Sequence, residues 1–280
     1  MIFRFGKRGA LGFPRAYLRE RYLVACNRPT VPLYWFTAIR NWGDLVGPYL
    51  VKAITGAEPV PAYSVKKTHL VAVGSVLAQC SESSLVWGAG FISENDQLGC
   101  CPGLISAVRG WHTAAKLEKH GIESPGVVGD PALLMPMFYR PLSIGKSVRI
   151  GLIPHYAELP LLRGIQLPDE VKIIDIRQDV EEFVDELVSC EVILSSSLHG
   201  LIAADAYSIP SLWVEFSSNV IGQGFKFNDY YSSLDEPDTR SHLVSLDRIK
   251  DLVQLASHAS LHNTYRHHEE LLRAFPWGGR

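Results

Sequence analysis

The amino-acid sequence predicts an α/β fold in two halves, each built on a parallel sheet. Short apolar runs alternate along the chain with amphipathic helical stretches, which is the pattern of βα units. The pattern breaks at Pro136–Pro141 and starts again at residue 148, after a stretch typical of a linker at 143–147. The length of 280 residues fits two modest domains or one large one. A hydrophobic fraction of 47% supplies enough apolar material for a sizeable core and excludes disorder.

The first half is expected to contain two helices and a series of short strands. Apolar runs predict the strands at 31–36, 69–73, 85–87, 104–108 and 127–128. One helix follows the polar turn at 37–44 and ends near Thr55, and a second spans about 111–120. Gly121 suits the left-handed position that ends this second helix.

The second half repeats the alternation from residue 148 onward. Strands are predicted at 148–153, 171–176, 192–194 and 211–214, and helices at 179–188, 199–207 and 246–256. Asp179 and Glu182 have the spacing of a capping box, which predicts the start of the first of these helices.

Four turns concentrate polar residues or glycines directly after predicted strands. They are Arg40–Asp44, Gly88–Phe91, Val108–Thr113 and Ser195–Gly200. Ligands of open α/β sheets bind outside the carboxyl ends of the strands. With two sheets facing each other, the active site is therefore expected in the cleft between them.

The first two turns allow a structural as well as a functional interpretation. Asn41 or Asp44 either caps the following helix or contacts a ligand, and Gly43 permits the turn. Gly88 and Gly90 let a ligand approach the backbone closely, but glycines also serve any tight turn between a strand and a helix. Neither the dinucleotide fingerprint GxGxxG nor the P-loop pattern occurs in the sequence.

The other two turns place side chains that can bind anions or transfer protons at the N-termini of predicted helices. Arg109 is suited to bind an anion beside the first N–H groups of its helix, or to pair with a nearby acid. His199 is suited to proton transfer or to a structural hydrogen bond, and Ser195–Ser197 to a phosphate cradle or a cap. His155 and Tyr156 also follow a strand, so we expect them to face the cleft.

Composition narrows the partners and the cellular setting. The 27 basic and 29 acidic residues give a net charge of −2, which argues against a general nucleic-acid binder. The five cysteines are scattered without CxxC spacing and fit a reducing cytoplasm. The C-terminal histidines are expected on a solvated helix face, because no acid or cysteine completes a metal set with them; they are His258, His262, His267 and His268. No metal site is predicted.

Residues 1–28 are predicted to form a basic N-terminal arm. Its basic side chains, opposed only by Glu20, are Arg4, Lys7, Arg8, Arg15, Arg19, Arg21 and Arg28. With apolar residues interleaved, the arm either touches an anionic membrane surface or is covered by solvent or a partner. No apolar run in the sequence reaches the roughly 20 residues of a membrane span, and the N-terminal residues do not have the pattern of a signal peptide.

Taken together, the turns resemble the motifs of the polysaccharide pyruvyl transferase family, in the family's order. The matching segments are Asn41–Asp44, Val108–Gly110 with Thr113, Gly129–Leu134, and Ser197–Gly200 followed by Ala203, Ala204 and Ile209–Pro210. Each segment is unspecific alone, whereas four in order are specific. The branch that makes ketal-pyruvate decorations on bacterial exopolysaccharides is the most similar.

The resemblance implies two Rossmann-like domains facing a cleft, as in GT-B glycosyltransferases. The N-terminal domain would span 29–142 and the C-terminal domain, with its terminal helices, 143–280. The implied reaction moves the pyruvyl group of phosphoenolpyruvate, without a cofactor, onto a hexose of an exopolysaccharide repeat unit and closes a cyclic ketal. A lipid-linked oligosaccharide is the implied acceptor, which predicts a cytoplasmic protein, peripheral at the inner face of the cell membrane.

The resemblance also suggests roles for particular residues. Arg109 is assigned to the anionic end of the donor, His199 to acid–base catalysis, and Asp44 to orienting the acceptor as a third catalytic candidate. Further substrate contacts are expected from Asn41, Gly43, Gly88, Gly90, His155, Arg177, Ser196 and Ser197. Asp130 is expected to fix a turn. Many relatives have an arginine where this chain has Ser197, so that anion contact must come from another residue or be absent.

Two other functions stay open at this point. A glycosyltransferase that uses a nucleotide sugar also works between two facing Rossmann-like halves, and it would bind a nucleoside diphosphate. A non-catalytic saccharide-binding subunit of polysaccharide assembly would bind sugar without releasing phosphate. The missing arginine before Leu198 is compatible with this last function.

Overall fold

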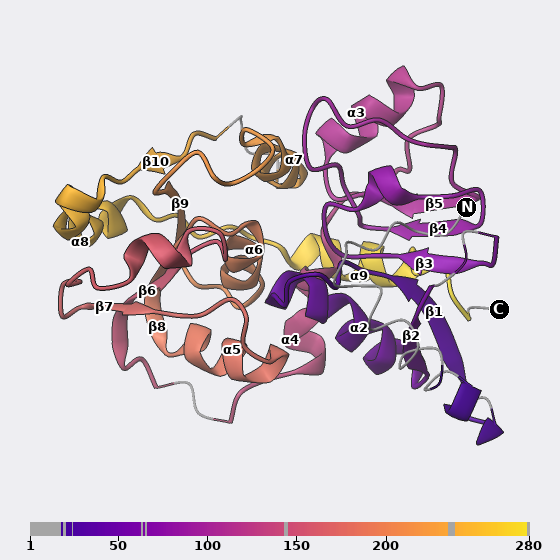
Figure 1. Ribbon diagram of the computed structural model, residues 1–280, viewed down its shortest axis with the longest axis horizontal. Helices are drawn as coiled ribbons and strands as arrows, with labels where there is room; N and C mark the ends of the chain where they lie inside the picture. The colour runs from indigo at the N-terminus through magenta and orange to yellow at the C-terminus, as the bar shows by residue number, and fades with distance from the viewer. Residues whose placement is uncertain are drawn as a thin grey trace.

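Two parallel sheets form the framework of the protein. The computed structural model describes residues 18, 21–23, 25–62, 64, 66–142, 145–234 and 239–278. Each sheet has five strands, and the strands that pair within it run parallel. In Figure 1 the sheets lie in two lobes, β1–β5 in the right-hand lobe and β6–β10 in the left-hand one. The α/β class with two parallel sheets is therefore confirmed, whereas most of the predicted basic arm lies outside the described residues.

The first sheet has the strand order β2-β1-β3-β4-β5. Its strands are β1 (Thr30–Tyr34), β2 (Glu58–Pro61), β3 (His69–Val71), β4 (Ser84–Trp87) and β5 (Leu104–Ala107). The helical elements of this part of the chain are α2 (Trp42–Thr55), η1 (Leu77–Gln79), α3 (Trp111–Lys119), η2 (Pro131–Leu134) and α4 (Met135–Phe138). The predicted strand at 127–128 is reduced to a single bridge between Val108 and Val128.

The second sheet has the order β10-β9-β8-β6-β7. Its strands are β6 (Val148–Ile153), β7 (Val171–Ile173), β8 (Cys190–Ser195), β9 (Ser211–Glu215) and β10 (His242–Leu243). The helical elements are η3 (Leu159–Leu162), α5 (Val180–Val188), α6 (Leu198–Ala206), α7 (Phe225–Ser233), η4 (Leu246–Asp251), α8 (Leu252–Leu255), η5 (Ala256–His258) and α9 (Tyr265–Arg273). The helix expected at 246–256 is thus a run of short 3₁₀ and α segments.

Two helix ends were predicted from particular residues, and the structure confirms the residue proposed for one of them but not the side-chain cap proposed for the other. Gly121 has φ +74°, the left-handed conformation expected after α3. Asp179 does stand at the N-cap position of α5, but its side chain makes no capping hydrogen bond there. It accepts a hydrogen bond from Arg40 instead. The predicted capping box is therefore wrong, because an arginine from the other half of the chain takes the carboxylate.

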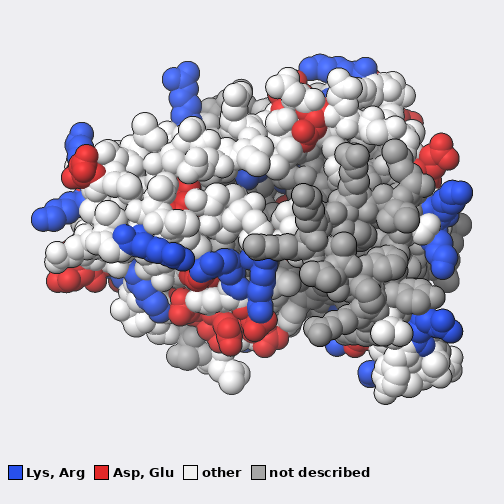
Figure 2. Space-filling view, viewed as in Figure 1, with Lys and Arg blue, Asp and Glu red and all other residues white. Residues whose placement is uncertain are grey.

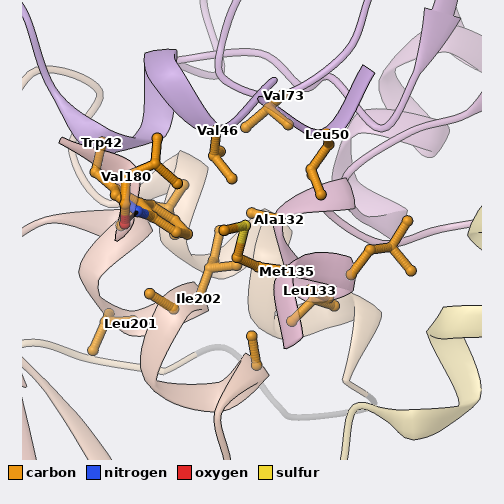
Figure 3. Close-up of a cluster of buried hydrophobic side chains, with 14 of the residues drawn as sticks. Trp42, Val46, Leu50, Val73, Ala132, Leu133, Met135, Val180, Leu201 and Ile202 are labelled. Atoms are coloured by element: carbon orange, nitrogen blue, oxygen red, sulfur yellow. Dashed lines mark hydrogen bonds between the residues drawn. The ribbon is translucent and has the colours of Figure 1, made fainter. Parts of the chain in front are cut away.

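Helix α2 joins the two halves through an apolar face. Asn41 caps it by accepting the N–H of Asp44 at 3.2 Å. Trp42 is fully buried, its backbone N–H donates to the carbonyl of Ile176 at 2.7 Å, and its indole donates to the carbonyl of Val180 at 3.2 Å. Figure 3 shows the resulting cluster, in which Trp42 and residues of α2 meet side chains from η2, α4, α5 and α6. Burial of this shared core fixes the halves against each other and so positions the loops between them.

The C-terminal helix α9 follows the second sheet in sequence but packs against the first half. The indole of Trp87 on β4 donates to the carbonyl of Leu271 at 2.8 Å. His267 is 1% exposed, and its Nδ1 donates to the carbonyl of Val128 at 3.0 Å. The expectation that all C-terminal histidines lie on a solvated face is therefore wrong for His267, because the helix crosses to the other half (Figure 1).

The surface carries both signs of charge. Figure 2 shows basic and acidic side chains interspersed on the described part of this face, with acidic ones grouped where α5 lies in Figure 1. Within the described residues, no helix is both long and apolar enough to cross a membrane.

Candidate functional site

A cavity of about 270 Å³ lies between the two sheets. Its walls come from the segments after β1, β3, β4, β6, β7, β8 and β9, so the carboxyl ends of strands from both sheets meet there, as parallel sheets favour. It is lined by Phe36, Asn41, Asp44, Gly74, Ser75, Val76, Ile92, His155, Tyr156, Ile176, Ser197, Leu198, His199, Ile221 and Lys226. Five of the residues proposed from sequence thus line one cavity: Asn41, Asp44, His155, Ser197 and His199.

Asn41 and Asp44 form the α2 side of the cavity. The Asn41 amide donates to the carboxylate of Asp44, in addition to the helix cap described above. Burial raises the pKa of Asp44 to about 7, against the opposing effects of the Asn41 hydrogen bond and the positive charge of Lys226. A carboxyl group with this pKa exchanges its proton near neutral pH, which suits acid–base work.

His199 lies at the start of α6 and meets the first motif directly. A Cβ on Gly43 would lie 2.0 Å from its Nδ1, so the glycine is required by the close approach of the imidazole. On the other side, Nε2 lies 3.7 Å from Oδ2 of Asp130, and neither atom has a hydrogen-bond partner among the described residues. Asp130 fixes its turn, as expected, by accepting the N–H of Ala132 at 2.9 Å. Its second oxygen, however, faces the candidate catalytic histidine.

Arg109 is fully buried and does not line the cavity. Its guanidinium pairs with Asp229 of α7 at 2.8 Å and donates to Ser75 Oγ at 2.7 Å and to the carbonyl of Phe91 at 2.6 Å. Asp229 also accepts the backbone N–H and the hydroxyl of Thr113. The geometry therefore favours the acid-pairing interpretation of Arg109, with the acid buried and on α7 rather than at the surface.

Lys226, one turn before Asp229 on α7, lines the cavity and was missed by the sequence reasoning. Its side chain is nearly buried, with 8% of the residue exposed, and no hydrogen bond or ion pair joins its ammonium group to another described residue. Burial and the charge of Arg109 lower its pKa to about 8. It is the only Lys or Arg in the sequence between Arg177 and Arg240, and this isolation is a signal that could have marked it as a candidate.

The N-terminus of α6 completes the same wall. Ser197 is the N-cap residue, but its side chain makes no capping bond, and the first N–H groups of a helix have no acceptor within it. Burial and the charges of Lys226 and His199 lower the pKa of His155 to about 3, which keeps its ring neutral at physiological pH. A buried ammonium, a helix N-terminus and a neutral imidazole together favour an anionic ligand.

Several predicted contacts lie elsewhere. Ser196 is fully buried and accepts the backbone N–H of His155 at 2.9 Å, so it shapes the wall from behind. The guanidinium of Arg177 is exposed and pairs with Asp175 outside the cavity. A Cβ on Gly88 would lie 2.2 Å from the ring of Pro131, and one on Gly90 would lie 2.6 Å from the guanidinium of Arg109. Packing between motifs thus explains both glycines, which do not line the cavity. No group of three or more possible metal ligands occurs among the described residues.

The raised pKa of Asp44 predicts a pH dependence of stability. The ordinary value is 3.8, so between about pH 4 and 7 the folded protein holds this proton more tightly than the unfolded chain does. The contribution of the protonated Asp44 carboxyl to the free energy of unfolding is therefore fully present below pH 4, and it is lost as the pH rises through 7. In Asp44→Asn, the free energy of unfolding in urea should therefore fall less between pH 5 and pH 8 than in the wild type. Identical pH dependence in the two proteins would contradict the raised pKa.

Comparison with known proteins agrees with the motifs. Residues 104–218 match the model of the polysaccharide pyruvyl transferase family. The chain is 26% identical over 216 residues to an uncharacterised protein of Acanthamoeba polyphaga mimivirus, covering 74% of this chain and 75% of that protein. It is 27% identical over 218 residues to the succinoglycan biosynthesis protein ExoV of Rhizobium meliloti strain 1021, covering 72% of this chain and 64% of that protein. No solved structure shows a significant match. The resemblance to the polysaccharide pyruvyl transferase family that was drawn from the motifs is therefore confirmed over residues 104–218.

Proposed function

We propose that the protein transfers the pyruvyl group of phosphoenolpyruvate to a hexose of a polysaccharide repeat unit, and that the cavity is the donor site. The observation that carries this proposal is Lys226, a buried cation on the cavity wall that makes neither a hydrogen bond nor an ion pair with the described residues. The carboxylates of Asp44, Glu158 and Glu215 act on this ammonium without forming an ion pair with it. A buried ammonium without hydrogen bonds is costly, so its place on the wall is best explained by an anion that binds it directly.

The size and polarity of the cavity support this donor. Phosphoenolpyruvate has three carbons and two anionic groups, and Lys226 and the N-terminus of α6 supply positive potential on the cavity wall. The volume of about 270 Å³ is below the roughly 300–1,000 Å³ usual for small-molecule pockets. A cavity of this size suits a donor as small as phosphoenolpyruvate.

The proposed reaction balances without an added reactant. Protonation of the donor's methylene carbon gives a methyl group and an oxocarbenium-like centre, which one sugar hydroxyl attacks as it loses its proton. The C–O bond to phosphate then breaks, and a second hydroxyl attacks the same carbon to close the cyclic ketal. Two hydroxyl protons are released, one replacing the proton given to carbon and the other balancing the departing phosphate.

His199 and Asp44 are the residues proposed to move these protons. Both line the cavity, and Asp44 has a pKa of about 7, so it exchanges a proton readily at neutral pH. Asp130 lies 3.7 Å from Nε2 of His199 and would stabilise the imidazolium that forms when the histidine accepts a proton. Arg109 takes a different role from the one expected: it is a positioning residue that holds α7, and hence Lys226, through Asp229.

We also propose which acceptor the protein uses and where in the cell the reaction takes place. The family match and the similarity to a succinoglycan biosynthesis protein support an exopolysaccharide acceptor, which we propose is lipid-linked. The two parallel sheets with a cavity between them are compatible with a GT-B-like arrangement. A lipid-linked acceptor would place the protein in the cytoplasm at the inner face of the membrane, with the basic arm of residues 1–28 as a contact to anionic lipid.

Thermal unfolding with added ligands tests this function. At about 100 times its Kd, phosphoenolpyruvate should raise the unfolding midpoint by about 5 °C, because a ligand that binds only the folded state stabilises it. UDP and UDP-glucose should leave the midpoint unchanged. Stabilisation by the nucleotides alone would support a glycosyltransferase instead, and saccharide binding without phosphate release would support a non-catalytic subunit.

A further inference from the structure

A second and larger hollow, of about 500 Å³, lies beside the donor cavity. Its volume is within the usual range of small-molecule pockets. It is lined by Ser93, Glu94, Asn95, His112, Gly222, Gln223, Phe225 and Asn228. The proposed reaction of the donor cavity does not use any of these side chains.

The two hollows are separated by one contact between two loops. Ile92 and Ile221 line the donor cavity, whereas the next residue of each loop, Ser93 and Gly222, lines the second hollow. A Cβ on Gly222 would lie 2.1 Å from the carbonyl oxygen of Ile92, so the loops touch there. The donor cavity and the second hollow therefore adjoin on the two sides of this contact.

Helix α7 and the loop before it line both the donor cavity and the second hollow. Lys226 lines the donor cavity, while Phe225 and Asn228 line the second hollow. Gln223 has φ +47°, between Gly222 at +106° and Gly224 at +83°. A non-glycine residue in the left-handed region is strained, and such strain is typical of functional sites. The strained backbone places the Gln223 side chain at the hollow.

The opposite wall is also held in place. Nζ of Lys116 donates to the carbonyls of Ser93 and Glu94, at 3.1 and 2.5 Å, and lies 5.7 Å from the centre of the Phe225 ring. This lysine therefore ties the 93–95 loop to α3 and to the start of α7. Both sides of the hollow are positioned by contacts that do not depend on a ligand.

The chemistry of the lining suits a neutral polyhydroxyl compound. Asn95 and Gln223 offer amides, which donate to and accept from hydroxyl groups, and Glu94 offers a carboxylate acceptor. Asn228 adds amide N–H donors, because its Oδ1 already accepts the backbone N–H of Thr239 at 2.9 Å. The aromatic face of Phe225 suits the apolar C–H face of a sugar ring. None of the described lining residues is Lys or Arg, in contrast to the donor cavity, so the hollow does not favour a phosphate or a carboxylate.

From this placement we infer that the second hollow is an acceptor subsite, which binds the sugar residue adjoining the hexose that takes up the pyruvyl group. The inference rests on the proposed function, because it assigns the reacting hexose to the mouth of the donor cavity. It makes this protein an enzyme that recognises at least two consecutive sugars. A disaccharide should then bind more tightly than its monosaccharide.

Calorimetric titration with methyl β-glucoside, cellobiose, cellotriose and lactose tests the subsite. The double variant Asn95→Ala/Gln223→Ala removes two exposed amides, and two lost hydrogen bonds should weaken the best-bound disaccharide by about tenfold. Its affinities for methyl β-glucoside and for phosphoenolpyruvate should stay unchanged. Arg248→Ala, which alters another hollow beside β10, is the matched control and should leave all affinities unchanged.

Two results would overturn the subsite. One is equal disaccharide affinity of the wild type and the double variant, and the other is a wild type that binds no disaccharide of the series more tightly than methyl β-glucoside. Failure of the proposed function is a separate result, namely no binding of phosphoenolpyruvate to the wild type. Thermal unfolding of the double variant checks that its fold is intact.

Discussion

Lys226→Met should weaken phosphoenolpyruvate binding by about 100-fold and at the same time raise the unfolding midpoint. One or two charge-assisted hydrogen bonds of about 1.5–3 kcal/mol each are lost with the ammonium, which accounts for the change in affinity. Stability rises because a buried charge that makes no hydrogen bond or ion pair with the described residues is replaced by an apolar side chain of similar length. Opposite effects on binding and stability are characteristic of a residue kept for function.

Two variants serve as controls for this result. Lys226→Arg keeps the charge and should retain most of the donor affinity. Lys116→Met removes another nearly buried lysine, but one whose Nζ donates to two backbone carbonyls, so its unfolding midpoint should fall instead of rise. Calorimetric titration with phosphoenolpyruvate measures the first effect, and thermal unfolding the second. An unchanged Kd in Lys226→Met would remove this residue from the donor site.

The sheets were predictable because their strands are short apolar runs that end in glycine or polar turns. Strand β2 escaped prediction since two of its four residues, Pro59 and Pro61, are prolines, which are tolerated at the edge position it occupies. Strand β10 has two residues and carries almost no signal. Helix α7 does have a signal in the sequence, namely apolar residues at helical spacing: Phe227, Tyr230, Tyr231 and Leu234. The glycines before the helix mask this pattern.

The candidate site was predictable where it depends on strand ends. Asn41, Asp44, His155, Ser197 and His199 follow strands, and parallel sheets bring such residues to one edge.

The placements of Arg109 and Lys226 depend on tertiary packing instead. Asp229, the partner of Arg109, lies 120 residues further along the chain, and no local pattern links the two. The same packing puts Lys226 on the cavity wall that Ser197 also lines. A buried lysine from α7 thus supplies positive charge to the wall for which the sequence predicted an anion contact from another residue or none.

His199→Ala should lower turnover by about 10²–10⁴-fold, the usual range for a general acid–base group. Donor affinity should change little, because the backbone N–H groups at the start of α6 and the ammonium of Lys226 remain. Steady-state kinetics of phosphate release gives the first quantity and calorimetric titration with phosphoenolpyruvate the second. Equal losses in both would make His199 a donor-binding residue instead.

Displacing the imidazole without removing it tests the same role independently. In Gly43→Ala the new Cβ would lie 2.0 Å from Nδ1 of His199, so the ring must move and turnover should fall by at least about tenfold. Gly47→Ala lies one turn further along α2, where the nearest atom to a new Cβ is Cβ of Val73 at 3.6 Å, an ordinary contact. This control should keep its turnover and gain stability, because alanine favours a helix over glycine by about 1 kcal/mol. Equal activities of the two alanine variants would show that the close approach of Gly43 and His199 does not matter for catalysis.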